Sequence, residues 1–415
     1  MRAQYLSVNG VSRVWNMILV INTGSSSIKM ALLEMPSERV IAEGAAVRLG
    51  EEEASLNWNV GGDIQHVALP AAGPDVAMQQ MLAILFRRMD KERITAVGHR
   101  VVHGGERFIA PTLLDDAVIA AIDELSHLAP LHNPPNLLGI RAAMRHLPAV
   151  AHIAVFDTAF HHAMPLHASL YAVPYRWYSE HGVRRYGFHG TSHHYVAQQA
   201  ADRLGRSFSD CHLLTAHLGN GCSAAAIAGG ISVDTTMGMT PLEGLVMGTR
   251  SGDVDPGLHD YMARQTGASL SEITAALNRQ SGLLGLSGRS NDMRALLAAA
   301  DAGDVRAGLA VDIFCFRLAK ALAGLAVSLG QIDALIFTGG IGEHADVVRA
   351  KTVQHLSLLG LVLDAHRNSE HGRLSGGLIS AVGAQVPVLV IATSEETMIA
   401  RYVVDMLQRL DRTAE

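Results

Sequence analysis

The chain has 415 residues, of which 49% are hydrophobic and 17% are charged. This length exceeds one average hydrophobic core and predicts two domains. The formal net charge of −6 argues against a nucleic-acid-binding protein, because such proteins normally carry a basic domain or stripe. We therefore expect a globular enzyme without a nucleic-acid partner.

Cysteine spacing and hydropathy indicate the compartment. The three cysteines form no CxxC pair and so indicate neither a disulfide framework nor a zinc knuckle: Cys211, Cys222 and Cys315. Residues 1–16 lack the apolar segment of a signal peptide, and we interpret them as an extension before Met17. The stretch 311–329 is apolar but contains three charged residues and precedes Gly330, which predicts a buried helix rather than a membrane span. Together these features predict a cytoplasmic protein without membrane contact.

Two short apolar runs, 17–21 and 28–33, flank the polar segment Asn-Thr-Gly-Ser-Ser-Ser, which predicts a β-hairpin. The same pattern recurs at 213–218 and 224–228, around Gly-Asn-Gly-Cys-Ser. This recurrence half a chain later predicts an internal duplication.

The remaining elements predict a mixed α/β chain. Apolar spacing predicts an amphipathic helix over 78–89, and aliphatic runs predict strands over 153–156, 334–337 and 388–391. A final helix is predicted from about Ser394. The last two strands run directly into glycine or helix-start sequences, where α/β proteins commonly bind ligands.

No Pro/Ser-rich linker marks a domain boundary, so the boundary has to follow from the repeats. We expect one domain of residues 1–157 plus 394–415, and a second of residues 158–393.

The segment Asn22 to Lys29 is a candidate phosphate-binding turn. Its glycine and three serines can donate hydrogen bonds to phosphate oxygens, and Lys29 supplies positive charge. It is not the G-x-x-x-x-G-K-[ST] pattern, which disfavours a P-loop NTPase. A polar hairpin turn without a ligand is the alternative interpretation.

Two further glycine turns follow apolar runs, at 217–221 and 339–343. Glycine lets a backbone approach a nucleotide closely. Each turn is a weak signal, but three such turns after three strands predict a nucleotide site built from separate loops.

Two arginines stand among glycines and polar residues. Arg100 lies in Gly-His-Arg-Val-Val-His-Gly-Gly-Glu, and Arg250 lies in Met-Gly-Thr-Arg-Ser-Gly-Asp. A guanidinium group can hold either a carboxylate or a phosphate by two hydrogen bonds. The alternative is that both are solvated surface residues.

Acidic residues follow two of the predicted strands. Asp157 comes directly after the strand 153–156 and is either an orienting group or the start of a turn. Thr393-x-x-Glu396 predicts a capping box at the last helix, which leaves Glu395 as a candidate for Mg²⁺ coordination, mostly through water.

Histidines cluster at 161–162, 189 and 193–194. Their spacing matches neither H-E-x-x-H nor a cysteine-containing zinc site. We expect His189 to donate a hydrogen bond to a phosphoryl group and the other histidines to be structural, buried or surface residues.

Taken in order, these segments resemble the acetate kinase family, within the superfamily of acetate and sugar kinases, Hsp70 and actin. The match runs from Met17 to the last helix and comprises N-x-G-S-S-S-x-K, GHRVVHGGE, FDTAFH, RRYGFHGTSH, HLGNG, GTRSGDVDPG, SGLLG, TGGIGE and T-x-E-E. The resemblance implies an α/β, duplicated ribonuclease H-like fold, as in actin-like ATPases, with two domains and a cleft between them.

The resemblance also implies residue roles. Asp157, His189 and Arg250 would be catalytic, and Asn22 and Glu395 would hold Mg²⁺, with Mn²⁺ as an alternative. Arg100 would bind the substrate carboxylate. An acyl pocket would be lined by Val102, Leu131, Phe188 and Pro241. Phosphate and ATP would be bound by Ser25, Ser27, Lys29, His217, Leu218, Gly219, Asn220, Gly221, Asp292, Met293, Arg294, Gly339, Gly340, Ile341, Gly342 and Glu343. The chain departs from the family pattern at Thr23, His162 and His344.

The activity implied is transfer of the γ-phosphoryl group of ATP to acetate by a homodimer, with closure of the two domains over the substrates. One rival is a propionate or butyrate kinase, because one methylene changes binding by only about 1–3 kcal/mol. The other rival is an ATP-dependent chaperone or actin-like binding protein of the same fold.

Overall fold

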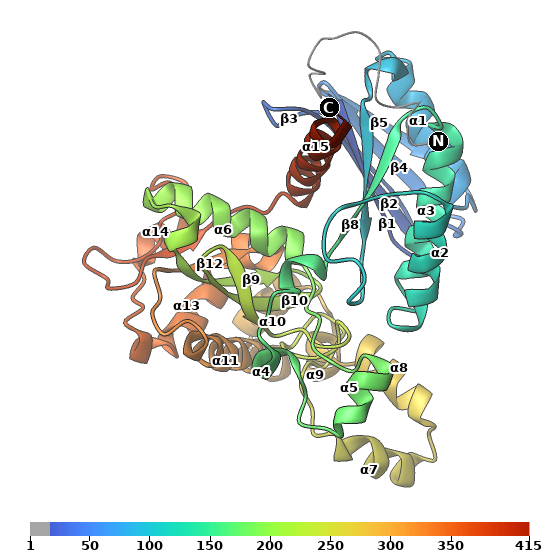
Figure 1. Ribbon diagram of the computed structural model, residues 1–415. Coiled ribbons are helices and arrows are strands. Elements are labelled where there is room, and N and C mark those ends of the chain that lie inside the picture. Colours follow the sequence, from blue (N-terminus) through green and yellow to red (C-terminus); the bar gives the residue numbers. More distant parts are fainter. Residues whose placement is uncertain (1–16, 415) are drawn as a thin grey trace. The chain divides into compact units, whose positions relative to one another are not determined.

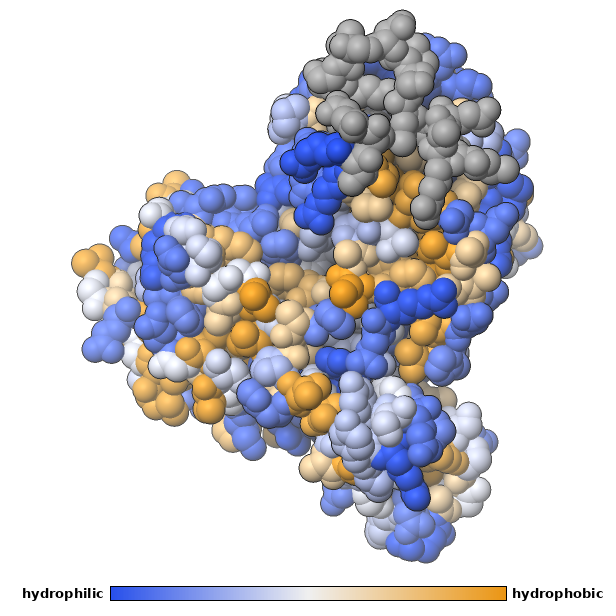
Figure 2. Space-filling view, viewed as in Figure 1, coloured by the Kyte–Doolittle hydropathy of each residue, from blue (hydrophilic) through white to orange (hydrophobic). Residues whose placement is uncertain are grey.

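The computed structural model describes residues 17–414 (Figure 1), so the predicted extension over residues 1–16 lies outside the described part. The described chain forms two compact units. Unit 1 contains the residues up to Ala159 and those from Ser394, and unit 2 contains Phe160–Thr393. Within these residues no helix has the length and apolar character that crossing a membrane requires. On the face that Figure 2 presents, apolar side chains are interspersed with polar ones.

Unit 1 is built on an eight-stranded sheet with the order β5-β4-β3-β2-β1-β6-β8-β7. Its strands are β1 (Met17–Thr23), β2 (Ser27–Glu34), β3 (Arg39–Val47), β4 (Ser55–Val60), β5 (Asp63–Ala68), β6 (Ala96–Val101), β7 (Thr112–Leu113) and β8 (Ala151–Phe156). Strands β1 to β5 form an antiparallel meander, whereas β6 and β8 run parallel to β1. The predicted hairpin at 17–33 is confirmed: β1 and β2 pair through a turn in which Gly24 N–H donates to Ser27 O at 2.8 Å.

Helices cover both faces of this sheet. They are α1 (Pro74–Phe86), α2 (Asp116–Glu124), α3 (Asn133–His146) and α15 (Glu395–Ala414), with short 3₁₀ turns η2 (Lys91–Arg93), η3 (Leu125–His127) and η4 (Ala159–His161). Alternate residues of β1 explain this arrangement: Leu19 packs in a core with α1 and α3, whereas Ile18 packs in a core with α15. Figure 1 shows α15 on the opposite face of the sheet from α1 and α3.

Unit 2 is built on a five-stranded sheet with the order β11-β10-β9-β12-β13. The strands are β9 (His212–Leu218), β10 (Cys222–Ala228), β11 (Ile231–Thr235), β12 (Ala334–Thr338) and β13 (Val388–Val390). The first three are antiparallel neighbours, and β12 and β13 run parallel to β9. Strands β3-β2-β1-β6-β8 of unit 1 follow the same order with the same directions. The predicted duplication of a ribonuclease H-like α/β fold is therefore confirmed.

The helices of unit 2 surround this sheet. They are α4 (Leu166–Ser169), α5 (Tyr175–His181), α6 (Gly190–Leu204), α7 (Gly257–Thr266), α8 (Leu270–Arg279), α9 (Gly282–Ser287), α10 (Met293–Asp301), α11 (Val305–Val327), α12 (Gly339–His344), α13 (Asp346–Gln354) and α14 (Ala365–Ser369), with η5 (Phe208–Asp210) and η6 (Ser357–Leu359). The predicted helix is α11, but it is amphipathic rather than buried: Phe316 is 49% exposed and Val327, where it ends, is 83% exposed. It begins six residues earlier than predicted because the Asp304 carboxylate accepts hydrogen bonds from the N–H groups of Arg306 and Ala307.

Two sequence predictions about helix starts are corrected. Helix α1 begins at Pro74 rather than Met78, since proline suits the first helical position, and it ends at Phe86. The capping box at Thr393 and Glu396 is wrong. Helix α15 begins at Glu395, and its first turn closes with Met398 N–H donating to Ser394 O. The N–H of Thr393 instead donates to the Glu343 carboxylate at 3.2 Å.

Candidate active site

Parallel strands of unit 1 bring three predicted site residues to one edge of the sheet. Asn22 lies at the end of β1, Arg100 lies near the end of β6, and Asp157 follows β8. Because β1, β6 and β8 are parallel neighbours, their carboxyl ends meet at the same edge. Glu395, the first residue of α15, reaches the same edge.

Arg100 is the centre of this cluster. Its Nε donates to Asp157 Oδ1 at 2.9 Å and its NH2 donates to Asp157 Oδ2 at 2.5 Å, a bidentate ion pair. Its NH1 donates to Asn22 Oδ1 at 3.3 Å, and Glu395 Oε2 lies 3.6 Å from Nε. The Asp157 side chain is only 1% exposed and the Arg100 side chain is 19% exposed, so the carboxylate of this ion pair is shielded from solvent.

The charges of the cluster do not balance. Burial raises the pKa of Asp157 to about 6; the Arg100 guanidinium opposes this rise, and the Glu395 carboxylate adds to it. Burial also raises the pKa of Glu396, with a further contribution from Glu395. Although burial by itself lowers the pKa of Arg100, the carboxylates of Asp157 and Glu395 outweigh it and raise that pKa. One guanidinium thus faces several carboxylates, and the excess of negative charge favours a further cation.

The residues predicted to hold Mg²⁺ fit such an ion. Asn22 and Glu395 offer an amide oxygen and a carboxylate oxygen around the same guanidinium, and Mg²⁺ prefers oxygen ligands. Within residues 17–414, no three His, Cys, Asp or Glu side chains form a metal-binding group. An ion bound here would therefore take most of its ligands from water and phosphate, as Mg²⁺ usually does.

The side chains of the predicted phosphate turn that would bind phosphate are partly or fully exposed to solvent. Ser25 and Lys29 are exposed, and Ser27 is half-buried. Lys29 lies directly opposite Asn22 in the β1–β2 register, so the two side chains point to the same face of the sheet. The turn and the Arg100 cluster therefore share one side of unit 1.

Two buried asparagines that the sequence reasoning missed support this edge. Asn136 on α3 donates through Nδ2 to Thr23 O at 2.6 Å and accepts from Val102 N–H at 3.0 Å. Asn133 accepts from His103 N–H at 3.1 Å and donates to His103 O at 3.0 Å. They fix the ends of β1 and β6. The available signal was Asn-Pro-Pro-Asn at a helix start, where the prolines suit the first turn and the asparagines can face inward.

In unit 2, the predicted residue His189 is held on two sides. It directly precedes α6 with a left-handed φ of 56°. Its Nδ1 lies 2.8 Å from the Ser223 hydroxyl, and its ring stacks on that of His217, with 4.3 Å between ring centroids. His217 is in turn fixed by the Ser192 hydroxyl, 2.7 Å from its Nδ1.

Arg250 lies beside this histidine. A Cβ added to Gly221 would lie 3.5 Å from His189 Nε2 and 3.5 Å from Arg250 NH1, so only glycine leaves the space between the two side chains open. Arg250 NH1 contacts Pro241 O at 3.4 Å, and burial lowers the pKa of the arginine. Among the described residues Arg250 has no carboxylate partner, in contrast to Arg100. It is a half-buried cation suited to an anionic ligand.

The two predicted nucleotide turns lie at the ends of neighbouring strands. The segment 217–221 begins with the last two residues of β9 and continues into the β9–β10 turn. The segment 339–343, predicted as a turn, instead lies in helix α12, which directly follows β12, and β12 is parallel to β9. Gly339 has φ +74°, and a Cβ there would come within 2.8 Å of Leu218 O. The Glu343 carboxylate accepts from Gly339 N–H at 3.0 Å and thereby ties this segment together.

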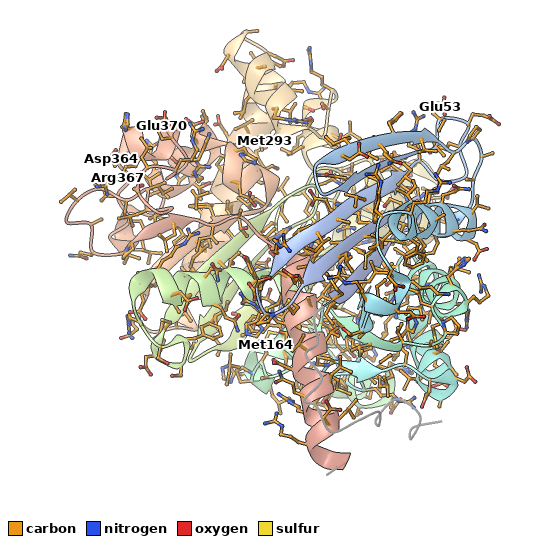
Figure 3. All side chains as sticks on the ribbon, turned by 90° about the horizontal axis from the view of Figure 1, so that it is seen from above. Glu53, Met164, Met293, Asp364, Arg367 and Glu370 are labelled. Atoms are coloured by element: carbon orange, nitrogen blue, oxygen red, sulfur yellow. The ribbon has the colours of Figure 1, made fainter. Side chains whose placement is uncertain are left out.

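Some predicted nucleotide residues are engaged within the protein. The Asp292 carboxylate caps α10 by accepting from Arg294 N–H, and it also pairs with the Arg294 side chain at 2.7 Å. Met293, labelled in Figure 3, is 3% exposed, and Leu218 is fully buried. These three therefore shape the loops, whereas Asn220 and Gly340 are exposed.

The predicted acyl-pocket residues are divided between the units. Val102 and Leu131 belong to unit 1, and Phe188 and Pro241 belong to unit 2. Val102 and Phe188 are buried, Pro241 is half-buried, and Leu131 is 51% exposed.

The other histidines of the cluster have structural contacts. His161 bonds to the Ser232 hydroxyl at 2.7 Å and to Phe188 O at 3.0 Å, and burial lowers its pKa to about 4. The ring of His194 stacks on Phe160 at 4.6 Å.

Comparison with known proteins relates this geometry to a family. A model of the acetokinase family matches residues 17–401. The acetate kinase of Deinococcus radiodurans is 55% identical over 383 residues, which cover 92% of this chain and 96% of that protein. The acetate kinase of Pseudomonas aeruginosa is 52% identical over 394 residues, with 95% and 99% coverage.

Solved structures agree. A propionate kinase from Francisella tularensis superposes with a TM-score of 0.89 at 41% identity, covering 93% of this chain and 98% of that one. An acetate kinase from Porphyromonas gingivalis superposes with a TM-score of 0.87 at 41% identity, covering 94% and 100%. The motifs, the duplicated fold and these matches over nearly the whole chain lead to one conclusion. The chain belongs to the acetokinase family.

Proposed function

We propose that this protein catalyses reversible transfer of the γ-phosphoryl group of ATP to acetate, giving acetyl phosphate and ADP. The observation that carries the proposal is the placement of Arg250, a half-buried cation without a carboxylate partner among the described residues, next to His189 and the glycine-containing segment 217–221. Such an arrangement suits an anion that must be bound closely and released again.

The reaction needs charge neutralisation more than proton transfer. A carboxylate oxygen of acetate bonds to the γ-phosphorus while the bond from that phosphorus to the bridging oxygen breaks, and ADP retains the electron pair. Acetate is already ionised at neutral pH, so no general base is required. The groups that matter are donors and cations around the transferring phosphoryl group, and we assign this role to His189 and Arg250.

Unit 1 supplies the acid-binding residues in this proposal. A guanidinium group has five N–H bonds, and three of those of Arg100 are used by Asp157 and Asn22. The two remaining N–H bonds are available to the substrate carboxylate, while Asp157 fixes the plane of the guanidinium. Val102, Leu131, Phe188 and Pro241 would line the acyl pocket.

The remaining assignments follow the family resemblance. The segments 217–221 and 339–343, with Asp292 to Arg294, would hold ATP, and Ser25, Ser27 and Lys29 would serve its phosphates. Asn22 and Glu395 would hold Mg²⁺, which supplies positive charge to the phosphate oxygens when bound. We further propose a homodimer acting in the cytoplasm; the three cysteines, all free and buried, are consistent with a reducing compartment.

Propionate is the second candidate substrate, because the Francisella tularensis structure with a TM-score of 0.89 is that of a propionate kinase. The test is a series of acetate, propionate and butyrate with ATP and Mg²⁺, in which hydroxylamine traps the acyl phosphate. We expect the highest kcat/KM for acetate. A higher value for propionate or butyrate would reassign the acid, and ATP hydrolysis without acid-dependent hydroxamate would instead favour a non-kinase ATPase.

A further inference from the structure

A chain of buried hydroxyl and imidazole groups leads from His189 into the core of unit 2. The Ser223 hydroxyl lies 2.8 Å from His189 Nδ1 and 2.8 Å from His193 Nε2. His193 Nδ1 lies 2.7 Å from the Thr215 hydroxyl. Ser223, His193 and Thr215 are all fully buried, so water does not compete for these bonds.

The direction of each hydrogen bond in this chain can be derived from its inner end. The Thr215 hydroxyl donates to Ala225 O at 3.4 Å, since a carbonyl can only accept. Thr215 Oγ1 therefore accepts from His193 Nδ1–H. Burial holds the pKa of His193 well below its usual value, so His193 is neutral and its Nε2 accepts from the Ser223 O–H.

Ser223 has one proton, and that proton is directed to His193. The oxygen of Ser223 must therefore accept a hydrogen bond from His189, which places a proton on His189 Nδ1. His189 Nε2 then carries a proton only when the ring is an imidazolium. The Nε2 edge is the one nearest Gly221, and Arg250 NH1 also approaches Gly221.

We propose that Ser223 is a positioning residue for phosphoryl transfer, which keeps the proton of neutral His189 on Nδ1, so that His189 donates to the phosphoryl group through Nε2 only as a cation. The inference rests on the proposed function, because it is the transferring phosphoryl group that receives this bond. The imidazolium places positive charge next to the transferring phosphoryl group. It is itself stabilised because its Nδ1–H donates to the buried Ser223 oxygen.

Several charged or titratable groups surround His189. His217 stacks on its ring, His193 is linked to it through Ser223, Arg250 lies across Gly221, and Cys222 precedes Ser223. The positive charge of Arg250 disfavours protonation of His189. The Ser223 acceptor at Nδ1 and an anionic ligand favour it.

The direct test is ¹⁵N-histidine NMR of the full-length protein as a function of pH, with His189→Gln to assign the resonance. We expect neutral His189 to carry its proton on Nδ1. In Ser223→Ala, we expect the pKa of His189 to fall and the Nε2–H form to appear. A proton on Nε2 of neutral His189 in the unmodified protein, or an unchanged tautomer and pKa in Ser223→Ala, would overturn the proposal.

Kinetics provide the second readout. Ser223→Ala should lower kcat by about ten- to a hundredfold, the loss of one hydrogen bond to a charged group, with the KM for the acid nearly unchanged. The decline of kcat on the alkaline side should move to lower pH. Ser223→Thr, which returns a hydroxyl to the same carbon, should restore the alkaline limb; failure to do so when Ser223→Thr is folded would contradict the proposal.

Ser232→Ala is the matched control. The Ser232 hydroxyl is equally buried and also lies 2.7 Å from a histidine Nδ1, that of His161, but it donates there, because His161 Nε2–H donates to Phe188 O. Ser232→Ala should reduce stability without moving the pH profile of kcat. An equal shift of that profile in Ser232→Ala and Ser223→Ala would show a merely structural effect and overturn the proposal. If the unmodified protein forms no acyl phosphate, the proposed function fails, while the NMR tautomer still decides whether Ser223 directs His189.

Discussion

The two arginines of the candidate site differ in their electrostatic surroundings. Arg100 is bound to Asp157 and lies near Glu395, whereas Arg250 has no carboxylate among its described contacts. Arg100 therefore has a structural ion pair, whereas Arg250 has no carboxylate partner among the described residues and is the arginine that we propose to bind an anion. Substitutions at the two positions should separate these effects.

Arg250→Ala should lower kcat by about 10³-fold, comparable to the loss of an arginine that stabilises a transferring phosphoryl group. Because no buried carboxylate is left behind, the melting temperature should change little. Steady-state kinetics and a thermal melt measure both quantities. A large loss of stability with normal kcat would contradict the role assigned to Arg250.

Arg100→Ala should raise the KM for the acid strongly and also destabilise unit 1 by about 3–5 kcal/mol, since it leaves Asp157 buried without its cation. Urea unfolding measures this loss. Adding Asp157→Asn to the same chain should recover much of the stability but not the activity. If Arg100→Ala were as stable as the unmodified protein, the Arg100–Asp157 pair would not have the structural role described here.

At the level of elements, the site is formed where strands end and helices begin. Asn136 of α3 connects the ends of β1 and β6, and the Glu343 carboxylate of α12 accepts from Gly339 N–H at the junction of β12 and α12. Glycines allow these elements to approach one another, and Gly339 at the start of α12 combines a positive φ with a close approach to the β9 backbone.

Gly339→Ala should destabilise unit 2 and raise the KM for ATP with little change in the KM for the acid. The left-handed backbone costs an L-residue about 1–2 kcal/mol, and the new methyl group would press on Leu218 O. Gly340→Ala is the matched control for stability, because an added Cβ there meets nothing within 4 Å. Equal melting temperatures for the two variants would contradict this prediction, because the backbone at residue 339 would then accommodate a Cβ without loss of stability.

At the level of the whole molecule, several buried histidines should dominate the response to acid, and Asp157, whose pKa burial raises to about 6, opposes them in part. His161 has a pKa of about 4, and burial also holds the pKa values of His193 and His99 well below the usual 6.5. These groups bind protons in the unfolded chain at pH values where the folded protein leaves them neutral.

The free energy of unfolding should therefore be highest above pH 6.5 and fall as the pH drops from 6.5 toward 4, by about 1.4 kcal/mol per pH unit for each such histidine. Urea unfolding at several pH values measures this slope. His161→Gln removes one titrating group and should reduce the slope by one proton. A slope that is unchanged in His161→Gln would show that this ring is not neutral in the folded protein.

Much of the molecule could be predicted from its sequence. The two hairpins, the internal duplication and the strand before Asp157 were predicted from apolar runs and the turns between them. The capping box failed because Thr393 has two partners far along the chain, Ser192 and Glu343, which local spacing cannot reveal.

The sequence by itself determined the family, the duplicated α/β architecture and the residue types of the site, because these follow from local patterns and from motifs that are contiguous in the chain. The tertiary structure alone decided which side chains hold those residues in place. Asn136 meets a carbonyl 113 residues away, and Ser223 meets His189 across 34 residues, through contacts that no local spacing encodes. The tertiary structure also decided that Arg100 pairs with a carboxylate and that Arg250, among the described residues, does not. The sequence gives the charge of a side chain, whereas its partner depends on folding.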